Sequence, residues 1–317
     1  MLALGILGSP QLRAQRATGG SPQAPLDDRP GAPVLSEVLA AQVMLDRVGF
    51  SPGEIDGQQG SNLKRALAAF QASRGLTPTG AIDDGTYQRL QQDSGNQPPL
   101  VSYGITDADV AGPFTPDIPA DLIEKARFAG LDYQSPLEAL SERFHANPSL
   151  LKALNPEATF TKAGEPLAVP NVTASASIAD LSGVTVVVTR ATSALTLEDA
   201  AGRVIFHAPV TSGSHHDPLP IGTWRVNGVQ QNPEFHYNPA LFWDANPTHS
   251  KARLAPGPNN PVGTVWIDIS KEHYGIHGTP EPSKIGHVES HGCVRLTNWD
   301  AQRVAAMVKP GTTVIFR

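Results

Sequence analysis

The sequence predicts a multidomain α+β protein, with helices toward the N-terminus and strands toward the C-terminus. The chain has 317 residues, more than a single hydrophobic core ordinarily serves. In its first hundred residues apolar side chains recur at helical three- and four-residue steps, whereas β-branched and aromatic runs bounded by Gly, Pro and Asn dominate after residue 184. We therefore expect separate folded units joined by linkers.

Composition excludes two functional classes. The chain carries 24 basic and 30 acidic residues, a formal net charge of -6, which provides no positive field for nucleic acid or for an anionic membrane surface. No apolar segment approaches the length of a membrane span. The 29 prolines and 29 glycines indicate strands, turns and extended linkers. We expect neither a nucleic-acid partner nor a membrane span.

Residues 1–33 are predicted to be a leader. The apolar run Met1–Gly8 is typical of the central part of a secretory signal, although no basic residue precedes it. We interpret it as a clipped export signal, and the alternative is a disordered leader without targeting meaning. Residues 15–33, rich in Gly, Pro, Ser and Gln, predict a disordered lead-in.

Residues 34–93 predict a compact three-helix unit. Val38, Ala41, Leu45 and Val48 share one helical face. A turn cluster at 51–57 precedes a second helix that Ser61 can cap, and a third short helix follows Asp83.

The middle of the chain predicts two linkers around a small module. Residues 94–130 contain repeated prolines and no long periodic pattern, apart from a short helix expected at 120–129. Residues 131–172 are expected to form the small module between the linkers. The Ala/Ser-rich stretch 173–183 is the second linker.

Residues 184–317 predict a mostly β domain. Its strands are expected at 184–189, 203–210, 223–226, 264–269 and 312–316. One clear helix interrupts them, opened by Thr297 in capping-box spacing with Asp300 and stopped by Lys309-Pro310-Gly311.

Cys293 is the only cysteine of the chain, so it cannot belong to an intramolecular disulfide. It stands in the run Ser290-His291-Gly292-Cys293-Val294-Arg295, sixteen residues after His277. A neighbouring histidine can take the thiol proton and return it to a leaving amine, and a glycine beside the nucleophile lets backbone N–H groups approach an oxyanion. Arg295 would share a strand face with Cys293 and could hold a substrate carboxylate. This pattern favours acyl transfer over a buried structural cysteine.

The histidines raise a metal-site alternative. His273/His277 and His287/His291 have the four-residue spacing that can hold a metal on a helix. Intervening glycines and prolines, such as Gly278 and Pro280, make a helix there unfavourable. We instead expect 273–277 to be a strand with both histidines on one face, and no metal.

Three segments resemble known families. The string Gly49-Phe-Ser-Pro-Gly-Glu-Ile-Asp-Gly57 with Ala69-Phe-Gln71 resembles the three-helix peptidoglycan-binding domain, the alternative being a helical spacer without ligand. The order Leu154-Asn-Pro156 and Gly164-Glu-Pro-Leu167 resembles a LysM glycan-binding module, which implies a strand, two helices and a strand over residues 131–172. The alternative is a degenerate remnant, because Ser135-Pro136 replaces the usual Gly-Asp. Residues 184–317, with His277-Gly-Thr279 and Ser290–Arg295, resemble the YkuD-type L,D-transpeptidase catalytic domain.

The last resemblance implies roles for individual residues. Cys293 would be the nucleophile and His277 the general base and acid, although the spacing alone does not decide between His277 and His291. The remaining implied site residues are Gly278 to orient His277, Ser290, His291 and Gly292 to shape the site and its oxyanion hole, and Arg295 to bind a substrate carboxylate.

The implied reaction joins or trims peptidoglycan. Cys293 would form a thioester with a tetrapeptide stem, and a second stem would accept it in a 3-3 crosslink, or a lysine of an envelope protein would accept it and become anchored. No cofactor is needed, because the thioester stores the acyl group. Peptidoglycan stems and glycan are the expected partners, and the periplasm or cell envelope is the expected location. The alternatives are a carboxypeptidase or endopeptidase using the same cysteine, and a non-catalytic wall-binding scaffold.

Overall fold

The computed structural model describes residues 23–25, 35–172 and 183–317. The predicted leader therefore lies outside the described residues except for the short strand β1 (Gln23–Pro25), and so does the predicted linker 173–183 except for Gly183. Within the described ranges, no helix is both long and apolar enough to cross a membrane.

The helical unit at the N-terminus forms where the sequence predicts it. Its helices are α1 (Glu37–Arg47), α2 (Ser61–Ser73) and α3 (Asp84–Asp93). Ser36 caps α1 and Asp83 caps α3 through side-chain oxygens that accept backbone N–H groups. Ser61 is the first residue of α2, and Gly60 occupies the cap position instead. Leu45, Phe50, Leu67 and Phe70 fill the core between these helices.

The region between residues 94 and 172 corrects two predictions. Its elements are β2 (Leu100–Gly104), α4 (Asp107–Ala111), α5 (Leu122–Lys125), α6 (Pro136–Arg143), α7 (Pro148–Leu154) and β3 (Pro166–Pro170). Residues 94–130 are thus not a plain linker, since they contribute β2, α4 and α5. No strand precedes α6 within 131–172, and β3 pairs antiparallel with β2. Tyr103 on β2 packs against Phe144 after α6, so the two strands and two helices share one core.

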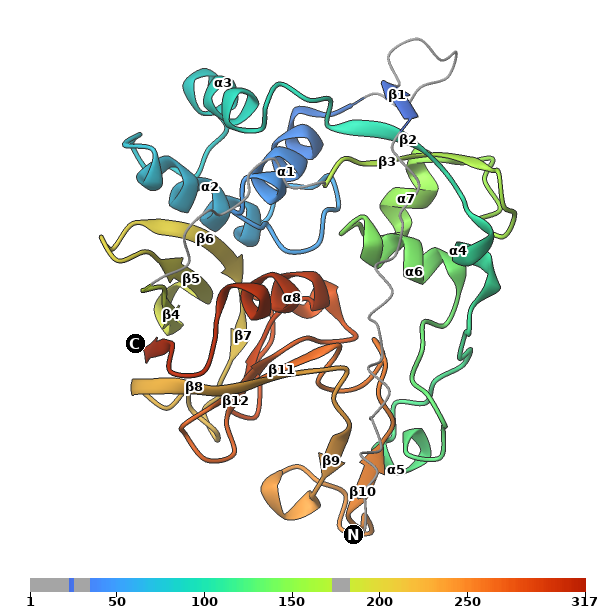
Figure 1. The fold of residues 1–317 in the computed structure, drawn as a ribbon, viewed down its shortest axis with the longest axis vertical. Coiled ribbons are helices and arrows are strands. Elements are labelled where there is room, and N and C mark those ends of the chain that lie inside the picture. Colours follow the sequence, from blue (N-terminus) through green and yellow to red (C-terminus); the bar gives the residue numbers. More distant parts are fainter. Residues whose placement is uncertain (1–22, 26–34, 173–182) are drawn as a thin grey trace, which may run out of the picture.

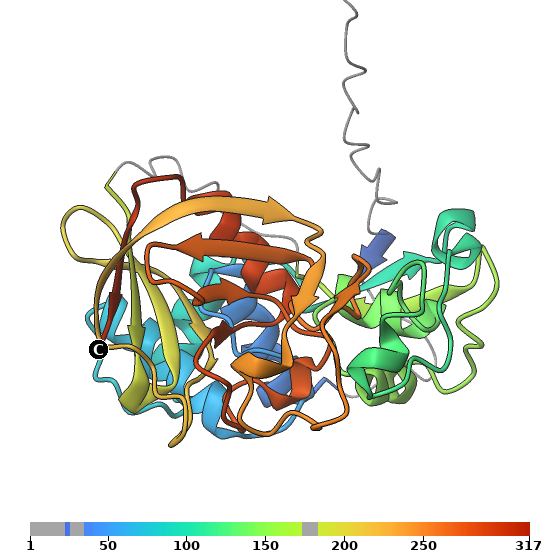
Figure 2. The same ribbon diagram turned by 90° about the horizontal axis from the view of Figure 1, so that it is seen from below.

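The C-terminal region is β-rich. Its longer strands are β4 (Thr185–Thr189), β5 (Ala194–Glu198), β6 (Val204–Pro209), β8 (Gly222–Gln231), β11 (Val265–Ile269) and β14 (Thr313–Phe316). With the shorter β7 (Thr211–Ser212), β12 (Gly275–His277) and β13 (Val294–Arg295) they form a nine-stranded sheet in the order β6-β5-β4-β14-β8-β11-β12-β13-β7. A separate hairpin pairs β9 (Phe235–Tyr237) with β10 (Ala252–Leu254). Figure 2 shows β8 and β11 running across this domain.

The predicted C-terminal helix is α8 (Asn298–Met307). Thr297 caps it by accepting the Asp300 N–H, as the sequence predicts. Ala301 and Val304 of α8 lie in the same buried core as strand residues such as Ile267 and Val294. The helix therefore closes one side of the sheet that carries the cysteine.

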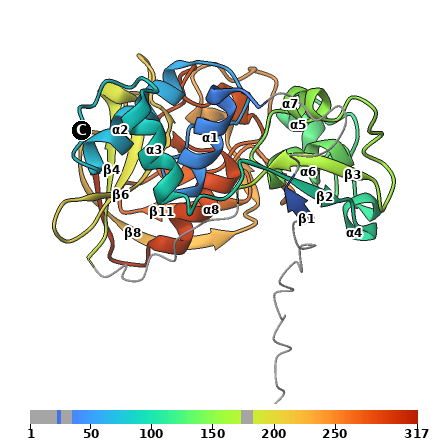
Figure 3. The ribbon, with the colours of Figure 1, turned by 90° about the horizontal axis from the view of Figure 1, so that it is seen from above.

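The N-terminal helices and the β-rich domain are in direct contact. In Figures 1 and 3, α1 and α2 lie over α8 and β6. Phe50 forms a β-bridge with His207 of β6, with the Ser51 N–H donating to the His207 carbonyl at 2.8 Å. The Ser51 hydroxyl also donates to Asp300 at 2.7 Å. This contact combines backbone pairing with buried side-chain hydrogen bonds.

Candidate functional site

Cys293 immediately precedes β13, a strand of two residues. Strand β13 runs parallel to β12 on one side and antiparallel to β7 on the other. Val294 is fully buried in the core, and side chains alternate across a sheet. Cys293 and Arg295 therefore lie on the face opposite Val294, as predicted, and each is half-buried.

The turn that presents Cys293 is held by Ser290. The buried Ser290 hydroxyl donates to the Cys293 carbonyl at 2.7 Å and accepts the Gly213 N–H at 2.7 Å. Gly292 has a φ of 99°, which favours glycine. A β-carbon there would lie 2.6 Å from the Tyr274 ring. The backbone of the turn can therefore pass close to Tyr274 only because position 292 is glycine.

His277 is held rigidly with one ring nitrogen left as a base. Its Nδ1 lies 2.7 Å from the Gly278 carbonyl, which can only accept, so Nδ1 carries the proton and Nε2 the lone pair. The ring stacks on Trp266 of β11, its register partner, with centroids 5.4 Å apart. Burial, assisted by the positive charge of Arg295, lowers the pKa of His277 to about 3. The imidazole is therefore neutral at pH 7.

The thiol and the guanidinium interact electrostatically. Burial raises the pKa of the Cys293 thiol, while a hydrogen bond from the Gly275 backbone and the charge of Arg295 act in the opposite direction. Arg295 sits directly beside His277 in the β12–β13 register. Its Nε is buried and has no hydrogen-bond partner among the residues that the structure describes. The positive charge of Arg295 therefore acts on both Cys293 and His277.

His291 is turned toward the β9–β10 hairpin. Its Nε2 lies 2.8 Å from an Asp244 carboxylate oxygen, and its ring packs edge-on against Phe242 with centroids 5.1 Å apart. The adjacent Trp243 is 59% exposed and stacks on His216 at 4.2 Å. The loop of this hairpin therefore contacts the turn that carries Cys293.

One histidine prediction is wrong. His273 does not share a strand face with His277, because β12 begins at Gly275 and His273 has a left-handed φ of 66°. Its exposed ring lies 3.5 Å from Glu272. Throughout the described ranges, no group of three or more His, Cys, Asp or Glu side chains could hold a metal ion.

Several residues around the site are not predicted from the sequence. Tyr274 lies against Gly292, Trp266 stacks on His277 and Asp244 binds His291. Asn298 accepts the Thr264 N–H at 3.1 Å and leaves no room for a β-carbon at Gly278. The pairing of Trp266 with His277 depends on the register between β11 and β12, which the sequence pattern of neither strand fixes.

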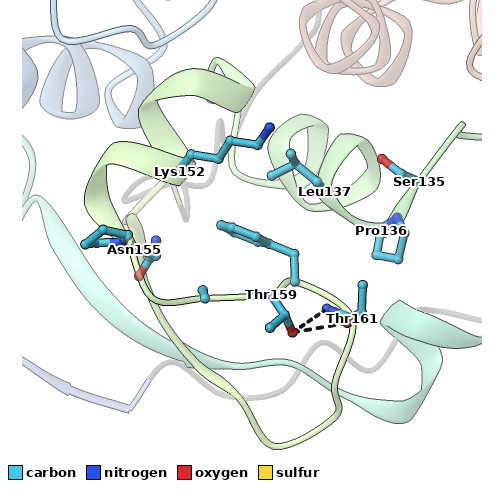
Figure 4. Close-up of a pocket in the computed structure, with 10 residues that line it drawn as sticks. Ser135, Pro136, Leu137, Lys152, Asn155, Thr159 and Thr161 are labelled. Atoms are coloured by element: carbon cyan, nitrogen blue, oxygen red, sulfur yellow. Dashed lines mark hydrogen bonds between the residues drawn. The ribbon is translucent and has the colours of Figure 1, made fainter.

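A pocket of about 440 Å³ lies in the 131–172 region (Figure 4). The start of α6 and the segment between α7 and β3 form its walls. Leu137 and Phe160 give it apolar surface, while Thr159 and Thr161 supply hydroxyl groups. The two threonine hydroxyls are 3.1 Å apart. The pocket therefore combines an apolar wall with hydrogen-bonding groups.

Two family models match the chain. Residues 183–316 match the model of the L,D-transpeptidase catalytic domain, YkuD. Residues 35–90 match the model described as "putative peptidoglycan binding domain". The first match contains the whole cysteine site, and the second contains α1 and α2 and most of α3.

Curated relatives match shorter stretches. The "Putative L,D-transpeptidase YkuD" of Bacillus licheniformis is 49% identical over 59 residues, 19% of this chain and 36% of that protein. Its Bacillus subtilis counterpart is 47% identical over 57 residues, 18% of this chain and 35% of that protein. The chain thus spans about a third of the length of these relatives.

Solved structures give weaker similarity. An L,D-transpeptidase from Mycobacterium smegmatis is 19% identical with a TM-score of 0.35, over 43% of this chain and 58% of that one. Because a TM-score of 0.35 is low, the family relationship rests on the two family models. The chain therefore contains a YkuD-family L,D-transpeptidase catalytic domain at residues 183–316 and a domain of the peptidoglycan-binding family at residues 35–90.

Proposed function

We propose that the protein is a cysteine-dependent L,D-transpeptidase that acts on peptidoglycan tetrapeptide stems. The observation that carries the proposal is the position of Arg295 in β13, directly beside His277 of β12, with Cys293 immediately before β13. A nucleophile, a base with its lone pair fixed and a partly buried cation are the parts that acyl transfer from an anionic peptide requires.

The first half-reaction transfers the acyl group to sulfur. His277 Nε2 takes the Cys293 proton, and the sulfur attacks the carbonyl of the third stem residue. The N–H groups of Gly292 and Cys293 stabilise the oxyanion, since the turn at Gly292 exposes successive amides. The C–N bond then breaks, the imidazolium protonates the amine of the departing D-alanine, and a thioester remains.

Arg295 links substrate binding to proton transfer. Its charge favours the thiolate of Cys293 but disfavours the imidazolium of His277. A stem carboxylate paired with Arg295 would neutralise that charge in a desolvated site, which raises the pKa of His277 and makes it a better base. Nε2 of His277 is therefore most basic when a stem carboxylate is paired with Arg295.

The second half-reaction depends on the acceptor. The side-chain amine of a neighbouring stem gives a 3-3 crosslink, and a lysine of an envelope protein gives an anchored protein. Water gives carboxypeptidase or endopeptidase activity, which is the second candidate. An exported location, in the periplasm or cell envelope, follows from the substrate, because peptidoglycan is outside the cytoplasm.

The experiment is incubation of the purified chain with a disaccharide tetrapeptide, followed by mass spectrometry. Two variants are incubated in the same way. Cys293→Ala removes the thiol, and Ser283→Ala is the control because Ser283 is exposed on the protein surface. We expect the wild type and Ser283→Ala to produce the crosslinked muropeptide dimer and to carry a thioester adduct. Cys293→Ala should give neither the dimer nor the adduct. Tripeptide alone would favour the hydrolase. The absence of any product, with retained binding to sacculi, would favour the non-catalytic scaffold.

The pocket of Figure 4 supports glycan as a further part of the same substrate. A sugar ring offers an apolar face and hydroxyl or acetamido groups, which match Leu137 and Phe160 on one wall and Thr159 and Thr161 on another. Ala158 also lines the pocket, so Ala158→Trp should fill it. Calorimetry with chito-oligosaccharide should show binding to the wild type and none to Ala158→Trp; equal binding by both would remove the pocket from the proposal.

A further inference from the structure

The loop that leads to Cys293 is in contact with the peptidoglycan-binding domain. The Asn62 side chain, near the start of α2, donates to the Ile285 carbonyl at 2.8 Å. The Arg65 guanidinium, one turn later, lies 3.4 Å from the Gly286 carbonyl. Arg65 also donates to the Asn62 side-chain oxygen, so the two side chains act together. Both side chains therefore hold the backbone at Ile285 and Gly286, which precede Cys293 by eight and seven residues.

The fit of this contact depends on a glycine. Gly286 has a φ of 79°, and a β-carbon there would overlap the Asn62 side chain and lie 2.9 Å from the Arg65 guanidinium. The backbone of the loop therefore approaches α2 as closely as a residue without a side chain permits. Such close approach transmits small displacements better than a loosely packed surface does.

Thr211 connects the gripped segment to the site. The fully buried Thr211 hydroxyl accepts the Gly286 N–H at 3.0 Å and lies 3.4 Å from the Lys284 carbonyl. In the sheet, Thr211 is the register partner of Arg295. Two residues later on the same segment, Gly213 donates to Ser290, whose hydroxyl holds the Cys293 carbonyl. A continuous series of hydrogen bonds and strand pairing thus runs from α2 to both Arg295 and Cys293.

We infer that Asn62 is a positioning residue for the catalytic cysteine, and that the peptidoglycan-binding domain is a structural part of the active site as well as a tether. Asn62 acts through segment 284–287 and Thr211, and touches neither substrate nor sulfur. The inference deepens the proposed transpeptidase function and rests on it. Displacement of α2 on its wall ligand would change the geometry of the Cys293 turn.

The test uses the full chain and measures Cys293 alkylation by iodoacetamide, which requires no substrate. Asn62→Asp keeps the side-chain shape and the oxygen that Arg65 contacts, but a carboxylate cannot donate to Ile285. The matched control is Gln88→Glu, the same amide-to-acid change on the exposed face of α3 in the same domain. We expect Asn62→Asp to change the alkylation rate by roughly 3- to 30-fold, the range that such networks transmit, and Gln88→Glu to leave it unchanged.

A second pair of variants tests the route. Thr211→Val removes the hydroxyl and should reproduce the effect of Asn62→Asp, whereas Thr211→Ser retains it and should restore the wild-type rate. Combined with Asn62→Asp, Thr211→Val should add less than its single effect, because both act on the same loop. In transpeptidation, the Asn62→Asp change should appear in kcat with KM for the tetrapeptide unchanged.

The outcomes separate this inference from the proposed function. Equal alkylation rates for wild type, Asn62→Asp and Gln88→Glu, with all three folded by circular dichroism, would overturn the positioning role even if transpeptidation were demonstrated. A changed rate in Asn62→Asp and in Thr211→Val but not in Thr211→Ser would support it, even for a protein whose product was tripeptide. If Asn62→Asp were unfolded, the Thr211 pair alone would decide the route.

Discussion

Asp46 and Arg303 face each other across the contact between α1 and α8, joined by two hydrogen bonds of 2.9 and 2.8 Å. His145 adds a third contact to Asp46 at 3.0 Å, and its ring stacks on Trp299. Burial alone would raise the pKa of Asp46, but Arg303 and His145 hold it well below its usual range. One ionised carboxylate therefore joins three segments of the chain.

Replacing that carboxylate should destabilise the whole assembly. Asp46→Asn leaves Arg303 without its bidentate partner in a buried setting, for which a loss of about 3 kcal/mol is expected. Urea unfolding followed by circular dichroism measures the change. Asp117→Asn, at an exposed position, is the matched control and should lie within about 0.5 kcal/mol of wild type. A similarly small loss in Asp46→Asn would show that the pair does not hold these segments together.

Substituting Arg295 should make the thiol less acidic. The Arg295 charge lowers the pKa of Cys293 against the effect of burial, so Arg295→Gln should move the alkylation midpoint of Cys293 to higher pH. The measurement is the iodoacetamide rate as a function of pH. The control is Arg190→Gln, which changes an exposed arginine of the same domain and should leave the alkylation midpoint of Cys293 unchanged. A midpoint that is unchanged or lower in Arg295→Gln would contradict the electrostatic role.

Gly292 is expected to tolerate no side chain. Gly292→Ala combines the strain of a left-handed residue, about 1–3 kcal/mol, with a β-carbon 2.6 Å from the Tyr274 ring. Gly202→Ala has comparable strain at a φ of 76° but meets nothing within 4 Å, which isolates the steric part. We expect kcat to fall at least tenfold in Gly292→Ala and to stay near wild type in Gly202→Ala. Equal kcat values would show that contact with Tyr274 does not shape the turn.

Glu142 should make stability depend on pH. Burial raises its pKa to about 7, while hydrogen bonds from Asn298 and Tyr133 oppose that rise. The folded state then binds more protons than the unfolded state between about pH 4.5 and 7, so stability falls as pH rises through that window. In Glu142→Gln, the fall in the free energy of unfolding between pH 5 and pH 8 should be smaller than in the wild type by about 2 kcal/mol. Urea unfolding at the two pH values measures this difference.

The control for that measurement is Glu157→Gln, which changes an exposed carboxylate. Burial also raises the pKa of Asp300 to about 7, so part of the wild-type slope should remain in Glu142→Gln. If Glu142→Gln kept the full slope, Glu142 would be ionised in the folded state and Asp300 would account for the pH dependence.

The sequence predicts elements whose determinants are local. Helices α1, α3 and α8 carry their caps and apolar periodicity within their own residues. Strand β2 could not be placed, because the pattern of Leu100–Gly104 becomes meaningful only through pairing with β3 far along the chain. The left-handed φ of His273 likewise has no signature in a run that alternates as a strand would.

For the candidate site, the sequence predicts the residues but not what holds them. Cys293, His277 and Arg295 stand in a recognisable motif, and their strand placement follows from alternation around Val294. Asn62 and Ile285 are 223 residues apart, and Asp244 and His291 are 47 apart. Periodicity within a window of a dozen residues carries no information about such contacts.

The β-bridge between Phe50 and His207 has a consequence for how the protein can be handled. Strand β6 is the last strand of the nine-stranded sheet, and the backbone of residues 49–51 occupies part of its open edge. Unpaired edge strands recruit other chains. A catalytic domain expressed without residues 35–90 would expose this edge of β6 and tend to self-associate. A loss of activity in such a truncated protein would therefore reflect aggregation as much as the loss of cell-wall binding.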